Sequence, residues 1–205
     1  MSVVLLTGFE PFGGVSMNPS AEVAKRLDGR RFGQSVVRAA VLPVDHEGAS
    51  LAVRGLLAAH DPVAVLHLGL AGERAQIAVE RVAINVMDYS IPDNVGFQAV
   101  DQPCVPGGPA AYFSTLPLRA LLRALHGAGI PAYLSATAGT YLCNFVMYTT
   151  LHALAARPAA PPAGFVHLPQ LPSMVPPDDP AQPSMDLGLM LRGTEVALET
   201  LTGSP

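Results

Sequence analysis

The sequence predicts an α/β fold, a single three-layer α/β/α domain around a mostly parallel, open and twisted sheet. Short apolar segments alternate along the chain with segments whose apolar residues recur at helical spacing. This alternation is typical of parallel strands that helices cover on both faces. Half of the 205 residues are hydrophobic and 14% are charged, so the chain can bury a full core. We therefore expect residues 1–205 to form one domain.

The first part of the chain is expected to begin with a buried strand and a well-capped helix. Asn18 is a suitable N-cap residue, and Pro19 suits the first helical position because its fixed φ fits a helix. The expected order is strand 3–6, helix 19–27, strand 35–42, helix 46–60, strand 63–68 and a strand-like stretch at 77–86.

The second part is expected to be looser, with a loop-rich passage at 87–109 before the next helix. Residues 169–183 are rich in proline, which cannot join a central sheet, so they are expected to form a surface loop. The C-terminal helix spans 184–201 in this prediction, with Ser184 as its cap. The expected order is helix 118–126, strand 130–134, a helix after Cys143 to residue 155, strand 165–168, the proline-rich loop and the last helix.

Charge and cysteine usage exclude several classes of function. The net charge is −4 and Lys25 is the only lysine, which argues against a nucleic-acid-binding groove. The apolar run at the N-terminus is too short for a signal peptide or a membrane span, and two cysteines give no disulfide framework. We therefore expect a cytoplasmic protein without membrane or nucleic-acid partners. Spacings typical of metal ligands or phosphate loops are absent from the sequence, so we expect no metal and no cofactor.

Cys143 is the candidate nucleophile. It follows the expected strand 130–134 and a turn of small residues, and it precedes a helical pattern. Free backbone N–H groups and the positive end of the helix dipole favour a thiolate at such a position, although cysteine is also a common buried hydrophobic residue. Parallel sheets place their sites at the carboxyl ends of strands, where this turn and several other special loops meet. That convergence favours the catalytic interpretation.

A cysteine nucleophile needs a base and a group that orients the base. Of the six histidines, His67 is expected to be a hydrogen-bonded core residue, whereas His167 stands at the carboxyl end of its strand. A structural role would also suit His167. Glu80 lies in an apolar strand, where Arg81 would point to the opposite face, so the carboxylate needs another partner. A histidine would serve.

Four motifs in this order resemble pyroglutamyl peptidase type I, also called pyrrolidone-carboxylate peptidase. They are TGFEPFGG at 7–14 with NPS at 18–20, ERVAIN at 80–85 with IPDN at 91–94, AGTYLCN at 138–144 and GFVHLP at 164–169. The resemblance implies a catalytic triad of Glu80, Cys143 and His167, and one catalytic domain with an open α/β/α sheet. It also implies removal of N-terminal pyroglutamate from peptides without a metal, in a cytosolic homodimer or homotetramer.

The chain departs from the family's commonest pattern at three positions. Ser90 stands where many members have an arginine, Phe145 replaces a frequent histidine, and Leu70 replaces a glutamine found in some members. An apolar slot is expected to bind the neutral lactam ring, and the residues expected to form it are Phe9, Phe12, Asn18, Tyr141 and Leu142. Packing in the core would suit Phe9 and Phe12 equally well. Another cysteine amidase or esterase on the same scaffold, or a catalytically silent binding protein, remains an alternative.

Overall fold

The computed structural model describes residues 2–203, and within them the main sheet has seven strands in the order β2-β3-β1-β4-β9-β5-β8. Strands β6 and β7 form a separate two-stranded sheet. The strands are β1 (Ser2–Phe9), β2 (Arg31–Phe32), β3 (Ser35–Leu42), β4 (Ala64–Leu70), β5 (Ile77–Glu80), β6 (Val82–Ile84), β7 (Ala111–Phe113), β8 (Ala132–Ser135) and β9 (Ala163–Leu168). The helices are α1 (Pro19–Leu27), α2 (His46–His60), α3 (Leu118–Gly127), α4 (Leu142–Ala155), α5 (Leu187–Thr202) and the short 3₁₀ helix η1 (Pro172–Met174).

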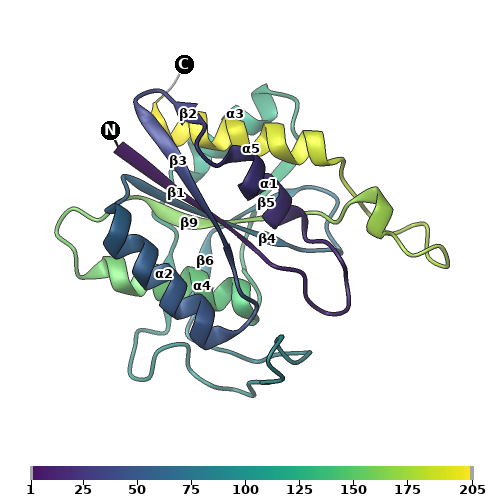
Figure 1. Cartoon of the computed structure of the whole chain (residues 1–205), viewed down its shortest axis with the longest axis horizontal. Coiled ribbons are helices and arrows are strands. Elements are labelled where there is room, and N and C mark those ends of the chain that lie inside the picture. The colour runs from purple at the N-terminus through teal and green to yellow at the C-terminus, as the bar shows by residue number, and fades with distance from the viewer. Residues whose placement is uncertain (1, 204–205) are drawn as a thin grey trace.

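Helices cover the main sheet on both faces. Helices α1, α3 and α5 lie on one face, and α2 and α4 lie on the other (Figure 1). The chain has two apolar cores, one on each face, because side chains alternate along each strand. In β4, Leu66 and Leu68 belong to the first core, and Val65 belongs to the second. The predicted α/β class and mostly parallel sheet are thus confirmed, with antiparallel pairing of β2 with β3 and of β5 with β9.

Side-chain caps fix the starts of the first two helices. The Asn18 side chain accepts a hydrogen bond from the backbone N–H of Ser20, and Pro19 is the first residue of α1, as predicted. Asp45 caps α2 in the same way by accepting from the N–H of Gly48. These caps satisfy backbone donors that a helix leaves free at its first turn.

The predicted strand-like stretch at 77–86 is wrong as a single strand, because it divides at Arg81. Strand β5 stays in the main sheet, whereas β6 leaves it and pairs with β7, a strand that the sequence did not predict. The side-chain amide of Asn144 binds both the N–H and the carbonyl of Ile84 at 2.9 Å. The hydrogen bonds that a neighbouring strand of the main sheet would make to this segment are therefore made by the first turn of α4.

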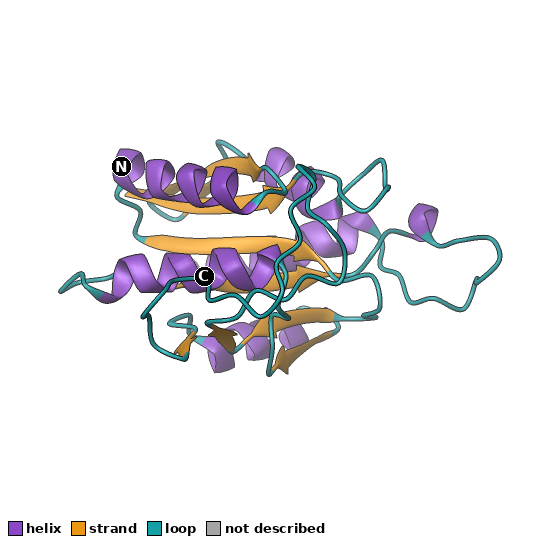
Figure 2. Cartoon of the chain, turned by 90° about the horizontal axis from the view of Figure 1, so that it is seen from below, coloured by secondary structure: helices purple, strands orange, loops and turns teal. Residues whose placement is uncertain are grey.

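The C-terminal helix begins later than predicted, and its cap is Asp186 in place of Ser184. The Asp186 carboxylate accepts from the N–H of Gly188 at 2.7 Å. Met185 lies outside the helix, and its N–H donates to the carbonyl of Gln170. The proline-rich segment before it carries η1 and extends away from the body of the molecule (Figure 2). None of the described helices has the length and apolar character needed to cross a membrane.

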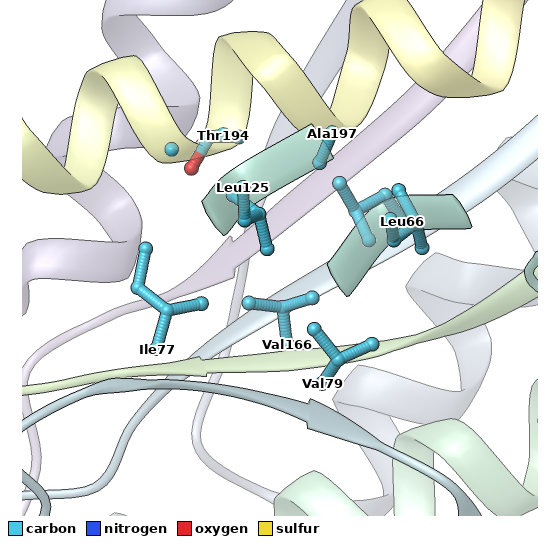
Figure 3. Close-up of a pocket in the computed structure, with 9 residues that line it drawn as sticks. Leu66, Ile77, Val79, Leu125, Val166, Thr194 and Ala197 are labelled. Carbon is cyan, nitrogen blue, oxygen red and sulfur yellow. The ribbon is translucent and has the colours of Figure 1, made fainter. Parts of the chain in front are cut away.

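The face that carries α1, α3 and α5 contains a small apolar cavity between α3, α5 and the sheet (Figure 3). Its volume is about 10 Å³, roughly the space that one water molecule needs. The hydroxyl of Thr194 donates to the carbonyl of Met190, so the polar atom at the cavity wall is already bonded. The cavity is a packing defect of the core, lined by Leu66, Ile77, Val79, Leu121, Leu125, Val166, Gly193, Thr194 and Ala197.

Candidate active site

The nucleophile candidate lies against the carboxyl end of the central strands. Cys143 is the second residue of α4, as the strand-turn-helix pattern predicted. A Cβ atom added to Gly69 would lie 2.8 Å from the Cys143 Sγ, so the sulfur packs directly on the glycine of β4. Gly69 is the register partner of His167 in the parallel β4–β9 pair. Since register partners on parallel strands point to the same face, the sulfur and the imidazole share one face of the sheet on adjacent strands.

His167 and Glu80 are joined by a buried hydrogen bond. The His167 Nδ1 lies 2.7 Å from the Glu80 Oε1, and both side chains are almost completely buried. The two residues come from β9 and β5, which run antiparallel. Because the carboxylate accepts the Nδ1 proton, the neutral ring keeps a free lone pair on Nε2. The arrangement gives His167 one nitrogen for orientation and one for proton transfer.

Glu80 has a second partner, Arg74, which the sequence prediction missed. The Arg74 Nη1 donates to the same Oε1 atom at 2.6 Å, while Oε2 is buried without a hydrogen-bond partner among residues 2–203. Arg74 lies in the loop after β4, at the carboxyl edge of the sheet. Its position at that edge was the signal that could have identified it.

Two effects that the sequence does not show oppose the predicted preference of Cys143 for a thiolate, and the side chain itself is half-buried. Burial, and next the negative charge of Glu80, raise the pKa of the Cys143 thiol to about 12. These effects outweigh the positive charge of Arg74 and the backbone N–H at the helix start, which lower it. Burial also lowers the pKa of His167. Both shifts favour a neutral thiol beside a neutral imidazole.

A small apolar pocket opens beside the sulfur. Its cavity volume is about 10 Å³, far below the roughly 300–1,000 Å³ of sites for drug-sized ligands. It brings together all five side chains predicted to bind substrate and adds two apolar residues, one of them at a position where the chain departs from the family's pattern. The lining residues are Phe9, Phe12, Asn18, Val44, Leu70, Tyr141, Leu142 and Cys143.

The two phenylalanines have different surroundings. Phe9 is 3% exposed and packs in the core, with its ring 6.4 Å from that of Phe165. Phe12 is half-buried and lies 5.8 Å from the ring of Tyr141. The Tyr141 hydroxyl donates to the carbonyl of Pro92, which fixes this ring at the pocket wall. Phe12 and Tyr141 therefore form the accessible wall, and Phe9 forms the buried floor.

Two asparagines position the site through hydrogen bonds within the chain. Asn18 accepts from the N–H and the hydroxyl of Ser20 and donates to the carbonyl of Glu10, so its polar atoms are largely occupied. Asn144 is buried next to the nucleophile and donates to the carbonyls of Ile84 and Val86. This bonding fixes the first turn of α4, and thereby the backbone of Cys143, against β6.

Two of the positions at which the chain departs from the family's pattern, Ser90 and Phe145, differ in their burial. Ser90 is exposed, and Phe145 is buried with its ring 6.1 Å from that of His46. His67 is the hydrogen-bonded core residue that was predicted, between the hydroxyls of Thr7 and Thr150. Residues 2–203 contain no group of three or more His, Cys, Asp or Glu side chains arranged for a metal ion.

Comparison with known proteins places this geometry in a family. The profile of the family described as Pyroglutamyl peptidase matches residues 2–203. A pyrrolidone-carboxylate peptidase of Escherichia fergusonii is 50% identical over 201 residues, which cover 98% of this chain and 92% of that protein. A pyrrolidone-carboxylate peptidase of Pyrococcus furiosus is 44% identical over 199 residues, with 96% of each chain covered.

Solved structures agree over the full length. The pyrrolidone carboxyl peptidase of Thermococcus litoralis superposes with a TM-score of 0.95 at 40% identity, covering 99% of this chain and 94% of that one. Pyroglutamyl peptidase I of Bacillus amyloliquefaciens gives a TM-score of 0.94 at 35% identity, covering 99% and 98% of the two chains. On the match of its sequence and its fold, this chain belongs to the pyroglutamyl peptidase family.

Proposed function

We propose that the protein is a cysteine peptidase that removes N-terminal pyroglutamate from peptides through a triad of Cys143, His167 and Glu80. The observation that carries the proposal is the sulfur of Cys143, which lines an apolar pocket and shares a sheet face with the His167–Glu80 pair. The names of the relatives, pyrrolidone-carboxylate peptidase and pyroglutamyl peptidase, support the same activity.

The pocket suits the chemistry of a pyroglutamyl residue. Its ring is a flat five-membered lactam without a charged amine, so an apolar slot between aromatic side chains can accept it. Phe12 and Tyr141 would contact the ring from the accessible wall, and Phe9 would support it from below. A free N-terminal ammonium would be costly to bury in the same slot. The pocket would therefore distinguish a pyroglutamyl residue from a residue with a free N-terminal ammonium by charge as well as by shape.

The reaction begins with a neutral thiol and a neutral imidazole. His167 Nε2 takes the thiol proton as the Cys143 sulfur bonds to the pyroglutamyl carbonyl carbon. The peptide C–N bond then breaks, and the imidazolium gives its proton to the departing nitrogen. Water attacks the resulting thioester with His167 again acting as base, which releases pyroglutamate and restores the thiol. Glu80 orients the ring and stabilises its positive charge in both steps.

Backbone N–H groups at the start of α4 would stabilise the oxyanion. Within the described residues, the N-cap Tyr141 makes no side-chain hydrogen bond to these groups. They therefore stay available close to the carbon that Cys143 attacks, and a helix start also carries positive partial charge. Asn144 would hold this turn in place through its bonds to the segment at 84–86.

The proposal is tested by comparing fluorogenic coumarin amides of pyroglutamate and proline. The two rings have equal size and differ in the lactam carbonyl and in the charge on nitrogen. We expect turnover of the pyroglutamyl amide, with the prolyl amide essentially inert. Equal turnover of the two amides would reject the assignment. Hydrolysis of simple acyl esters alone would favour the amidase or esterase alternative, and binding without turnover would favour the silent binding protein.

We also propose that the chain acts as one catalytic domain and assembles as a homodimer or homotetramer. Exposed hydrophobic side chains such as Leu51, Val95 and Phe113 support an assembly, since such side chains gain from burial between subunits. Light scattering at micromolar concentration should give a mass of two or four chains. The mass of a single chain would contradict the assembly and leave the chemistry untouched.

A further inference from the structure

Arg74 supplies a positive charge next to the His167–Glu80 pair. We assign this residue a role in addition to those of the three triad residues. We propose that Arg74 is a positioning residue whose charge and hydrogen bond hold the Glu80 carboxylate on His167, and that it so sets the pH range of catalysis. The proposal rests on the proposed function of the triad. It assigns no contact between Arg74 and the substrate.

The geometry of the carboxylate is the first argument. Glu80 Oε1 accepts from the His167 Nδ1 at 2.7 Å and from the Arg74 Nη1 at 2.6 Å, while the side chain of Glu80 is completely buried. A buried carboxylate without a counter-charge is strongly disfavoured and takes up a proton instead. Arg74 supplies the permanent positive charge, because a guanidinium does not lose its proton in proteins.

The second argument is how Arg74 is held. Its Nη2 donates to the carbonyl of Thr137 at 3.4 Å, and its guanidinium lies 6.0 Å from the ring centre of Tyr133. The side chain therefore joins the loop after β4, the end of β5 and the turn that leads to Cys143. A planar guanidinium contacts these two acceptors through two separate nitrogens, whereas a lysine would bring the same charge to Glu80 on one nitrogen.

The third argument is the set of charges around the pair. The charged side chains that shift the pKa values of both His167 and Cys143 are Glu80 from β5 and Arg74 from the loop after β4. Tyr141 and Tyr89 lie near Cys143, and their own pKa values are raised by burial, so both phenols stay neutral near pH 7. The remaining carboxylate in this group, Asp93, acts on the two tyrosines.

Removing Arg74 should therefore change the protonation of the pair in a defined direction. The negative charge of Glu80 would then favour a second proton on His167, because Arg74 is one of the groups that lower the pKa of His167. That proton removes the neutral imidazole that acts as the base. The active form then exists only at higher pH, so the acid limb of the kcat/KM profile moves upward.

The test compares Arg74→Met and Arg74→Lys with the wild type between pH 5 and pH 9.5, using the pyroglutamyl coumarin amide. For Arg74→Met we expect an acid limb higher by about one pH unit, and kcat/KM at pH 7 lower by up to about tenfold, the most that a one-unit shift of a single protonation causes. Arg74→Lys keeps the charge and should restore the limb to near its wild-type position. Arg157→Met is the matched control, because Arg157 pairs with the exposed carboxylate of Asp61 and should behave as wild type.

Each outcome decides the proposal. A wild-type limb in Arg74→Met, whether or not the rate falls, would overturn it, since a purely structural role lowers the rate without moving the limb. A limb that stays shifted in Arg74→Lys would overturn the argument from charge. If Arg74→Met does not fold, Arg74→Gln takes its place, with the same expected shift.

A second readout separates this proposal from the proposed function. The rate at which iodoacetamide alkylates Cys143 needs no substrate, and mass spectrometry in a Cys104→Ser background assigns it to one thiol. Because Arg74 lowers the pKa of Cys143, its removal should move the alkylation midpoint to higher pH. A wild type that alkylates but does not turn over pyroglutamyl amides would reject the proposed function. An unmoved midpoint would reject the role of Arg74.

Discussion

The two faces of the central sheet differ in what they bury. The face under α1, α3 and α5 buries apolar side chains, which leave one small apolar cavity between them. The face under α2 and α4 buries hydrogen-bonded polar groups beside an apolar core, among them His67, Glu80, Asn144 and His167. The same strands supply both faces, since residues alternate along them. One face therefore provides stability alone, while the other gives up apolar packing to hold a reactive centre.

The largest expected effect is a difference in kcat/KM between alanine variants of two histidines, His167 on one side of the sheet and His126 on the other. His167→Ala removes the proposed base and acid, so kcat/KM should fall by roughly 10²- to 10⁴-fold. His126 lies on α3, and its ring hydrogen-bonds the carbonyl of Ala132. His126→Ala should keep kcat/KM within about twofold and lose modest stability, as expected for one net hydrogen bond. Equal losses of activity would show that the two faces are not distinct in function.

The next effect compares the floor and the wall of the pocket. Phe9→Ala deletes a buried core ring and should lower the free energy of unfolding by about 3–5 kcal/mol. Phe12→Ala should cost less stability and mainly raise KM, because its half-buried ring would contact the substrate equally before and during reaction. Chemical denaturation and steady-state kinetics measure the two. Unfolding of both variants would mean that the pocket wall is also core.

A smaller effect concerns the pH dependence of stability through His67. Burial lowers the pKa of His67 to about 3, so between pH 6.5 and that value the unfolded chain binds a proton that the folded chain does not. Acid therefore favours unfolding in this window, by about 2 kcal/mol at pH 5 for this residue. His67→Gln cannot titrate, and its stability should fall less from pH 7 to pH 5. Urea titrations at the two pH values measure this fall in the free energy of unfolding. An equal fall in the wild type and in His67→Gln would contradict the assignment.

The smallest effect tests the packing defect on the apolar face. Val79 lines the cavity, and Val79→Ile adds one methyl group to empty space. Filling it should raise the free energy of unfolding by up to about 1 kcal/mol. The kcat/KM value should not change, because Val79 points away from the reactive face. A loss of stability in thermal melts would show that the space does not accept the methyl group.

Much of the fold followed from the sequence because buried strands and helices carry strong apolar periodicity. Helix 46–60 and strand 35–42 agree with α2 and β3 at both ends. Strand β7 has three residues, two of them exposed, which leaves no pattern to detect. The split of 77–86 depends on a side chain 60 positions away, Asn144, and no local pattern reports such a contact.

The site was predictable where an unusual residue stood in an apolar segment. Glu80 and His167 stood out for that reason, their roles in a triad were implied by the family resemblance, and the structure joins the two side chains. Arg74 was missed because a charged residue in a loop is ordinary until its partner is known. The raised pKa of Cys143 could not be predicted, since position at a helix start is visible in sequence whereas burial beside Glu80 is not. Local patterns located the groups, and tertiary contacts decided their charge.

The most direct measurement compares the two cysteines. Cys143→Ala and Cys104→Ala are assayed with the pyroglutamyl coumarin amide, and thermal melts verify that each variant is folded. Cys104 is buried and hydrogen-bonded to the carbonyl of Ile84, outside the substrate pocket. The account predicts no detectable turnover by Cys143→Ala and near wild-type kcat/KM for Cys104→Ala. Turnover by folded Cys143→Ala at the wild-type rate would contradict it.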